Sequence, residues 1–357
     1  MDRYIGIDSG KLDTKSAVYQ ENKQVMRHKF RTRIGEGDFA DDEMETGAFI
    51  AEVDGKVYKV GNGARMPANL ETSKMTEVHR ICSLVAIAMC CDENTVDNVH
   101  VAIGIPVSEF SVVSKRNEYR EFILPTGEVS VTLKTGNNKQ PKKIRFNIVE
   151  KIVCPESSGI LYLDPARHVD KESAILDIGN LNVNGTYWNG FDINPDYCLT
   201  AELGGNILIS NLAQELTARF GSCNESIVAS VLKKPLEERC LIPVREDVRE
   251  QVMKESREVI DQMLREHVET IKRKCNTKHW SLNFMDIVFV GGTTQLLRKE
   301  INDVFGDSVT IAEDPVFANA VGFLTKLCSR SLGVFLPDKC KENEKSNGSK
   351  KELKKAS

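Results

Sequence analysis

Two segments of this chain place an acid and a glycine directly after a run of apolar residues. In the first segment, the run at positions 4–7 ends at Asp8 and Gly10. Lys15 follows seven positions after Asp8, where the strand pattern resumes. Glycine lets backbone N–H groups approach a polyanion, and a lysine can neutralise phosphate charge. The spacing therefore predicts a phosphate-binding hairpin over 4–19, although an acid and a glycine this close also suit an ordinary hairpin turn.

The second segment, at positions 173–190, repeats this arrangement. A mainly apolar strand pattern runs into Asp177 and Gly179, crosses a polar turn and resumes as a strand over 183–188. An internal duplication of a phosphate-binding hairpin predicts two similar domains that face one ligand. A third strand pattern, within 285–297, runs into two glycines and then into a helix pattern.

Strand patterns alternate with helix patterns in both halves of the chain, which predicts an α/β protein. Apolar spacing and turn residues define each element, and the pair Asp54-Gly55 is a strong hairpin signal. The expected helices are 77–90, 111–122, 204–221, 225–232, 245–275 and 316–327, and a short one lies within 154–163. The expected strands and hairpins are 4–19, 47–61, 98–106, 129–133, 144–153, 173–190, the start of 285–297 and 309–312.

Composition narrows the functional classes. The chain has 357 residues, with 41% hydrophobic and 28% charged residues, which suits two ordinary globular domains. A net charge of −4 argues against an electrostatic grip on nucleic acid by the whole protein. The ten cysteines show no C-x-x-C spacing and are typical of reduced core residues. With no signal-peptide pattern and no apolar run long enough to span a bilayer, we expect a soluble, cytoplasmic protein without membrane attachment.

The three strand-to-glycine turns, in this order, resemble those of the actin superfamily of nucleotide-binding ATPases. Within it, the chain is most similar to the bacterial plasmid-segregation actins of the ParM type, from position 4 to about 327. The resemblance implies an actin-like fold, in which two related α/β domains with duplicated mixed sheets flank a central nucleotide cleft. The implied parts are 1–165 as domain I, with an inserted subdomain at about 32–75 and completed by 319–337; 166–318 as domain II, with a helical subdomain at about 206–284; and 338–357 as a lysine-rich disordered tail.

In this family the first hairpin is a phosphate loop, so the resemblance assigns roles to its residues. The backbone of the turn contacts the β- and γ-phosphates of ATP, Lys15 neutralises phosphate charge, and Asp8 holds hydrated Mg²⁺. The alternative is a turn-forming acid and a solvated strand lysine. The nucleotide-binding residues implied here are Asp8, Ser9, Gly10, Lys11, Leu12 and Lys15.

Two acids are implied to act in hydrolysis. Glu156, in the Pro-Glu-Ser sequence after a strand, resembles the glutamate that orients the attacking water, because a carboxylate can accept a hydrogen bond from water. Its alternative role is that of an acid favouring the N-terminal end of a helix dipole. Asp177 is implied to act on the attacking water or on water bound to Mg²⁺. The metal ligands implied are therefore Asp8 and Asp177, mainly through water.

The second hairpin departs from the family pattern. Gly179 is retained for backbone access to phosphate, and Gly179, Asn180 and Asn182 are also implied to bind the nucleotide. The family commonly has another glycine, a threonine and a second acid where this chain has Asn180, Asn182 and Asn184. Amides can replace hydrogen bonds but not negative charge. The departure is compatible with a nucleotide-binding fold, but it leaves open the rate of hydrolysis and any role of Asn184 near the metal.

The remaining implied contacts concern the adenosine. They are Gly291, Gly292 and Thr293 at the purine and ribose, Gly204 and Gly205 beneath the sugar, and Lys233 and Glu237 beside the base. For the last two, the alternative is stronger, because a lysine and a glutamate on a charged helix are more often plain solvated surface residues. Asn319, Ala320 and Gly322 resemble the second connecting segment, where small residues permit a close helix crossing, although a plain core helix predicts them too.

The resemblance implies an ATPase, with GTP as an open alternative, that uses Mg²⁺ and polymerises head to tail. Such a filament separates plasmid copies through a DNA-bound adaptor protein of the ParR type at its end, so no direct contact with nucleic acid is expected. A monomeric small-molecule kinase of the same superfamily is the alternative. The sequence shows no motif for a polar pocket with a base aimed at a substrate hydroxyl.

Overall fold

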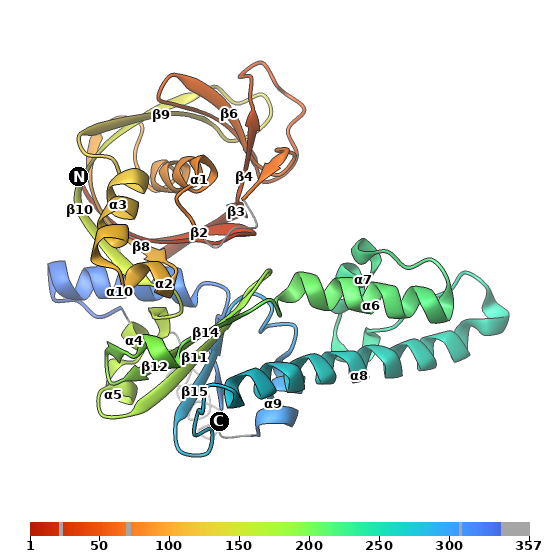
Figure 1. Cartoon of the computed structure of the whole chain (residues 1–357). Helices are drawn as coiled ribbons and strands as arrows, with labels where there is room; N and C mark the ends of the chain where they lie inside the picture. The colour runs from red at the N-terminus through yellow and green to blue at the C-terminus, as the bar shows by residue number, and fades with distance from the viewer. Residues whose placement is uncertain (21–23, 69–72, 307–308, 337–357) are drawn as a thin grey trace, which may run out of the picture.

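The computed structural model describes residues 1–20, 24–68, 73–306 and 309–336 (Figure 1). Within these ranges the chain forms two mixed β-sheets flanked by helices, which confirms the predicted α/β class. The tail predicted at 338–357 lies outside the described residues. No helix in the described part of the chain is both long enough and apolar enough to cross a membrane.

The first sheet contains ten described strands and curls around helix α1 (Glu77–Ala88) (Figure 1). The strands are β1 (Asp2–Ser9), β2 (Asp13–Tyr19), β3 (Val25–Arg31), β4 (Arg33–Glu36), β5 (Ala48–Val53), β6 (Lys56–Gly61), β7 (Met66–Pro67), β8 (Val96–Ile105), β9 (Glu128–Lys134) and β10 (Lys142–Pro155). Their spatial order is β3-β2-β1-β8-β10-β9-β5-β6-β4-β7. Strand β8 lies parallel to both β1 and β10. The apolar faces of these strands and of α1 form one buried core.

Strands β4 to β7 come from the segment expected to be an inserted subdomain, yet they continue the first sheet, because β5 pairs with β9. The predicted hairpin at Asp54-Gly55 is confirmed, and both residues have positive φ. The charged helix expected over 111–122 is confirmed as α3 (Val113–Ile123), and a short helix not expected from the sequence, α2 (Val107–Phe110), precedes it. They are separated because Val112 is extended. The domain boundaries themselves stay a prediction.

The second sheet carries the second hairpin. Its strands are β11 (Glu172–Ile178), β12 (Val183–Asn189), β13 (Asp192–Ile193), β14 (Leu199–Ala201), β15 (Asp286–Val290) and β16 (Thr310–Ile311). The order is β13-β12-β11-β15-β16, and β14 pairs with β12. Strand β15 lies parallel to β11 and β16.

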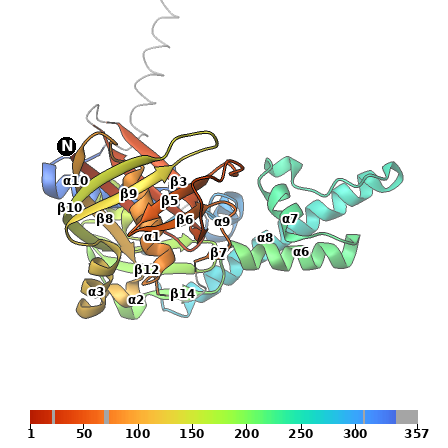
Figure 2. The same ribbon diagram turned by 90° about the horizontal axis from the view of Figure 1, so that it is seen from above.

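Helices of the second half share a separate core with this sheet. They are α6 (Gly205–Phe220), α7 (Glu225–Leu232), α8 (Arg249–Asn276) and α9 (Arg298–Phe305). Helices α6, α7 and α8 extend away from both sheets, as two views at right angles show (Figures 1 and 2). A 3₁₀ turn (Glu246–Val248) precedes α8, so that helix begins a few residues after the expected start at 245.

Two connections join the sheets, and they cross closely. Helices α4 (Gly159–Leu163) and α5 (Pro165–His168) lead from β10 to β11, and α10 (Ala318–Leu332) returns from the second sheet to pack on β1. A Cβ at Gly322 would meet the carbonyl of Gly159, and one at Gly159 would lie 2.5 Å from the oxygen of Ala318. The two backbones therefore touch, which confirms that small residues permit a close crossing here.

Candidate functional site

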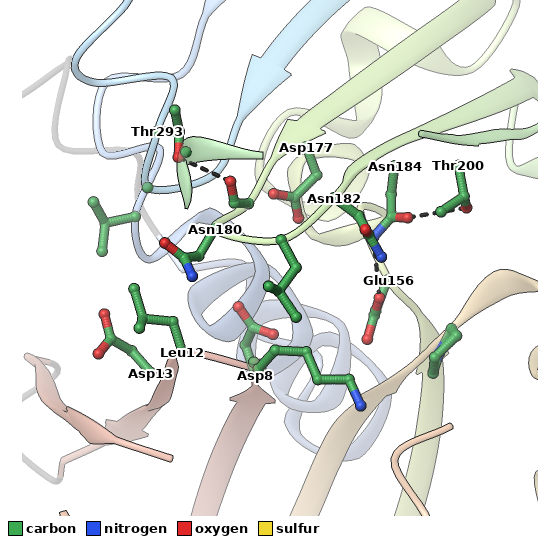
Figure 3. A pocket seen from close by; sticks show the side chains of 18 of the residues that line it. Asp8, Leu12, Asp13, Glu156, Asp177, Asn180, Asn182, Asn184, Thr200 and Thr293 are labelled. Atoms are coloured by element: carbon green, nitrogen blue, oxygen red, sulfur yellow. Dashed lines mark hydrogen bonds between the residues drawn. The ribbon is translucent and has the colours of Figure 1, made fainter. Parts of the chain in front are cut away.

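A cavity of about 810 Å³ is lined by residues of both sheets (Figure 3). This volume is within the range of sites that enclose a small-molecule ligand. Both hairpins face it, β1–β2 from the first sheet and β11–β12 from the second. The cavity therefore lies where the sequence predicts that two related units meet one ligand.

The two hairpins turn in the same way. The N–H of Gly10 donates to the carbonyl of Asp13 at 3.1 Å, and the N–H of Gly179 donates to the carbonyl of Asn182 at 3.0 Å. In the first turn a Cβ at Gly10 would lie 2.8 Å from that carbonyl oxygen, so the tight turn requires glycine. The predicted repetition of the hairpin is confirmed at the level of the backbone.

The strand registers match as well, but the paired side chains differ. Asp8 lies opposite Lys15, and Asp177 lies opposite Asn184. The second hairpin thus has an amide where the first has a cation. This difference controls the charge state of the two acids.

Asp8 and Lys15 form an ion pair at 2.9 Å, with the Asp8 side chain only 8% exposed. Burial alone would raise the pKa of Asp8, but the charges of Lys15 and Lys74 hold this pKa below its usual value. Burial opposes the charge of Lys15, whereas the Asp8 and Asp177 carboxylates raise the pKa of Lys15. Both members of the pair are therefore charged at neutral pH, in contrast to the solvated lysine of the alternative interpretation.

Asp177 has no such cation opposite it. Burial and the nearby charge of Asp8 raise the pKa of Asp177 to about 6. Its Oδ2 accepts a hydrogen bond at 2.9 Å from Nδ2 of Asn319, which comes from α10. The sequence placed Asn319 at the crossing of the two connections but did not identify it as a partner of this carboxylate.

The raised pKa of Asp177 predicts a pH-dependent stability difference in the protein free of metal and nucleotide. Between about pH 4 and pH 6 the folded state holds a proton that the unfolded state releases, so the free energy of unfolding falls as pH rises through this window. Asp177→Asn removes the titrating carboxyl and, with it, this fall in the free energy of unfolding. We expect the variant to be more stable than the parent at pH 7.5, by at most about 3 kcal/mol, with the gain disappearing near pH 4. Urea denaturation at both pH values measures it, and an equal difference at both would contradict the assignment.

Glu156 is held from two sides. Lys74 forms an ion pair with its Oε1. Nδ2 of Asn184 donates to its Oε2 at 3.4 Å (Figure 3). Asn184 is in turn oriented by Thr200, whose hydroxyl donates to Oδ1 at 3.1 Å. The first turn of α4 contains no acid, so Glu156 does not act as the helix N-terminal acid of the alternative interpretation. The sequence around Lys74 gives no indication of this ion pair, because its partner Glu156 lies far along the chain.

Several of the residues predicted to contact the adenosine form hydrogen bonds to the second hairpin. Thr293 donates its N–H to Ile178 at 3.0 Å and its hydroxyl to the Gly179 carbonyl at 2.8 Å. The N–H groups of Gly204 and Gly205, where α6 begins, donate to carbonyls of the same turn. A Cβ at Gly205 would lie 2.6 Å from Oγ1 of Thr293, so these glycines permit close packing of helix, strand and turn.

Most of the predicted binding residues contribute to the cavity lining. They are Asp8, Gly10, Lys11, Leu12, Lys15, Glu156, Asp177, Gly179, Asn180, Asn182, Gly205, Lys233, Gly292 and Thr293. Four others lie outside the lining: Ser9, Gly204, Glu237 and Gly291. Ser9 is buried in β1, Gly204 packs on the turn at Asn180, and Gly291 packs against Asp177. Glu237 lies in the exposed turn Leu236–Glu238, which leaves its predicted contact with the base without support from its position.

The carboxylates fit a hydrated cation better than a closed metal cage. The described residues contain no group of three or more His, Cys, Asp or Glu side chains that could hold a metal ion. Asp8 and Asp177 do face the same cavity. Mg²⁺ retains several waters and binds through one or two carboxylates together with substrate phosphates. The donor set therefore suits Mg²⁺ that arrives with a phosphorylated ligand.

Comparison with known proteins agrees with this geometry. Residues 6–159 match a family described as the N-terminal domain of actin-like proteins. The Alp12 filament structure is 21% identical with a TM-score of 0.70, covering 92% of this chain and 99% of that chain. The ADP complex of Ta0583, an archaeal actin homologue, is 17% identical with a TM-score of 0.69, also covering 92% and 99%. A 15-stranded ParM filament from Clostridium botulinum is 17% identical with a TM-score of 0.66 and the same coverage.

A search of curated proteins finds no match to this sequence. At the identities above, the solved structures establish the fold. Residues 6–159 therefore match the N-terminal domain family of actin-like proteins, and the described chain as a whole has the actin-like fold.

Proposed function

We propose that this chain binds ATP with Mg²⁺ in the cavity, hydrolyses it, and assembles into head-to-tail filaments whose stability depends on the bound nucleotide. The observation that carries the proposal is the pair of matching hairpins, each of which directs an acid and a glycine turn into one cavity. The ADP complex of Ta0583 supports a nucleotide as the ligand. The filaments formed by Alp12 and by the ParM protein of Clostridium botulinum support assembly.

The first hairpin supplies the phosphate contacts in this proposal. Backbone N–H groups of the turn that follows Ser9, other than that of Gly10, which donates to Asp13, bind the β- and γ-phosphates. Lys15 neutralises their charge while it remains paired with Asp8. Asp8 and Asp177 would hold Mg²⁺ mainly through water, and the ion would supply positive charge that offsets phosphate charge. Gly292 and Thr293 border the adenosine, together with Lys233 from the end of α7.

Glu156 positions the attacking water. Its carboxylate accepts a hydrogen bond from the water, so that the water oxygen is in line with the bond between the γ-phosphorus and the bridging oxygen. As the oxygen attacks, that bond breaks, ADP leaves with the bond electrons, and the water proton passes to the carboxylate. The products are ADP and inorganic phosphate.

Assembly follows from the position of the nucleotide between two units. A ligand that touches both hairpins favours one angle between them, and loss of the γ-phosphate removes part of that preference. A head-to-tail contact is heterologous and does not close, so it generates a filament. In the full proposal the filament separates plasmid copies in the cytoplasm through a DNA-bound adaptor of the ParR type, without contacting DNA itself.

Sedimentation tests assembly directly. We expect the protein to pellet on ultracentrifugation with ATP and Mg²⁺ and to remain in the supernatant without nucleotide. Asp8→Ala should abolish pelleting, because it removes a metal ligand and leaves the buried Lys15 unpaired, whereas Asp170→Ala, at an exposed position, should pellet normally. GTP in place of ATP tests base preference. A protein that binds ATP but never pellets would instead fit a monomeric small-molecule kinase.

A further inference from the structure

Lys74 is a buried cation in the lining of the cavity, and the assignments above leave it without a role of its own. Its side chain is only 5% exposed, and its ammonium pairs with Oε1 of Glu156. It also lines the cavity together with Asp8 and Lys15. A lysine this deeply buried requires a partner for its charge, and the partner here is the proposed water-positioning acid.

The backbone around Lys74 is fixed from both sides. Nζ of Lys11, in the turn of the first hairpin, donates to the carbonyl of Ser73 at 2.8 Å. On the other side, Thr76 caps α1, with its side chain accepting from the N–H of His79. The phosphate turn and the start of α1 therefore place the ammonium of Lys74 beside Glu156.

The charges around Lys74 leave its ammonium able to bind a second anion. Asp8 is neutralised by Lys15, and Lys74 also lowers the pKa of Asp8, so its charge acts on the phosphate side of the cavity as well. An ammonium has three donors. Within the described residues, the ammonium of Lys74 forms one ion pair, with a single oxygen of Glu156. Lysine acts as a compact charge on a flexible stem and can contact two anions at once.

We propose that Lys74 determines specificity for a nucleoside triphosphate by bridging Glu156 and the terminal phosphate. This inference rests on the proposed function. The water held by Glu156 attacks the terminal phosphorus, so a cation on the same carboxylate lies beside the place of that phosphate. A diphosphate has no group there, so it gains nothing from Lys74. The bridge keeps Glu156 next to the reacting phosphorus only while the triphosphate is intact.

The test compares two nucleotides on the full chain in the presence of Mg²⁺. Binding of a non-hydrolysable ATP analogue and of ADP is measured by calorimetry for the parent and for Lys74→Met. We expect the variant to lose about 10- to 100-fold in affinity for the triphosphate, the effect of one charge-assisted contact, while ADP affinity stays nearly unchanged. Lys74→Arg should retain most of the triphosphate preference.

Two further variants separate phosphate binding from simple stability. Lys74→Met combined with Glu156→Gln removes both buried charges, and it should show the same selective loss of triphosphate binding as the single variant. Lys56→Met removes a lysine whose pair with Glu77 is exposed and outside the cavity lining, and it should change neither affinity. Equal losses for ATP analogue and ADP, or no loss for either, would overturn the role of Lys74. A parent protein that binds neither nucleotide would overturn the proposed function itself, and this inference with it.

Discussion

Glu156→Gln is expected to slow nucleotide hydrolysis about 100- to 10,000-fold while ATP affinity stays close to that of the parent. Glutamine has nearly the same shape, and its one carbonyl oxygen can still accept from either Lys74 or Asn184, which contact different oxygens of Glu156. Glutamine cannot take a proton from the attacking water, and it lacks the negative charge that orients this water. The substitution therefore removes an interaction that matters in the transition state and leaves ground-state binding largely intact.

Single-turnover phosphate release measures the rate, and a separate titration measures affinity. Glu118→Gln, on the exposed face of α3, is the matched control and should hydrolyse ATP at the parent rate. Because Glu156→Gln leaves the buried Lys74 without a full charge partner, thermal unfolding of the parent and of both variants should be measured alongside the kinetics. Unchanged hydrolysis in a folded Glu156→Gln protein would remove this residue from the reaction.

The local chemistry of each hairpin could be predicted from sequence because it is encoded within a few residues. Asp8, Gly10 and Lys15 lie within one turn and its two strands, so their spacing alone brings them together. The same holds for Asp177 and Gly179. The contacts that cross the molecule could not be predicted in this way. The bond from Asn319 to Asp177 depends on the path of α10, which lies far from β11 in the sequence.

Glycines show a different limit of the sequence. A glycine indicates close approach of some group to the backbone, but the pattern does not say which group. Gly204 and Gly291 were predicted to make room for a nucleotide. In the structure an added Cβ would meet the turn at Asn180 for the first and Asp177 for the second, so packing within the protein already requires each glycine. Gly292 does line the cavity.

The asparagines of the second hairpin change the charge of the site as well as its hydrogen bonding. Asn184 occupies the register position that Lys15 occupies in the first hairpin. Without a cation there, Asp177 has a raised pKa, whereas the pKa of Asp8 is lowered. Asn184 instead orients Glu156 from the second sheet, so the acid proposed to position water is held by groups from both halves of the protein. A change in the angle between the halves would therefore alter the orientation of Glu156.

Gly291→Ala and Gly292→Ala should separate folding from nucleotide binding at two adjacent positions. Gly291 has φ of +96°, and an added Cβ would meet Oδ1 of Asp177 and lie 2.5 Å from the carbonyl oxygen of Ile178. Strained backbone and overpacking each cost about 1–3 kcal/mol, so we expect Gly291→Ala to lower the free energy of unfolding by about 2–4 kcal/mol. Denaturant unfolding without nucleotide measures this loss.

Gly292→Ala is the matched comparison, because a Cβ there meets no atom within 4 Å and the residue lines the cavity. Its free energy of unfolding should stay within about 0.5 kcal/mol of the parent. The added methyl group takes space that the proposal gives to the nucleotide, so ATP and ADP affinity should both fall, by about 10-fold or more. Full affinity in a stable Gly292→Ala protein would place the adenosine elsewhere in the cavity. Normal stability of Gly291→Ala would mean that the turn between β15 and α9 can move away from Asp177, and that this carboxylate is not fixed by the packing around it.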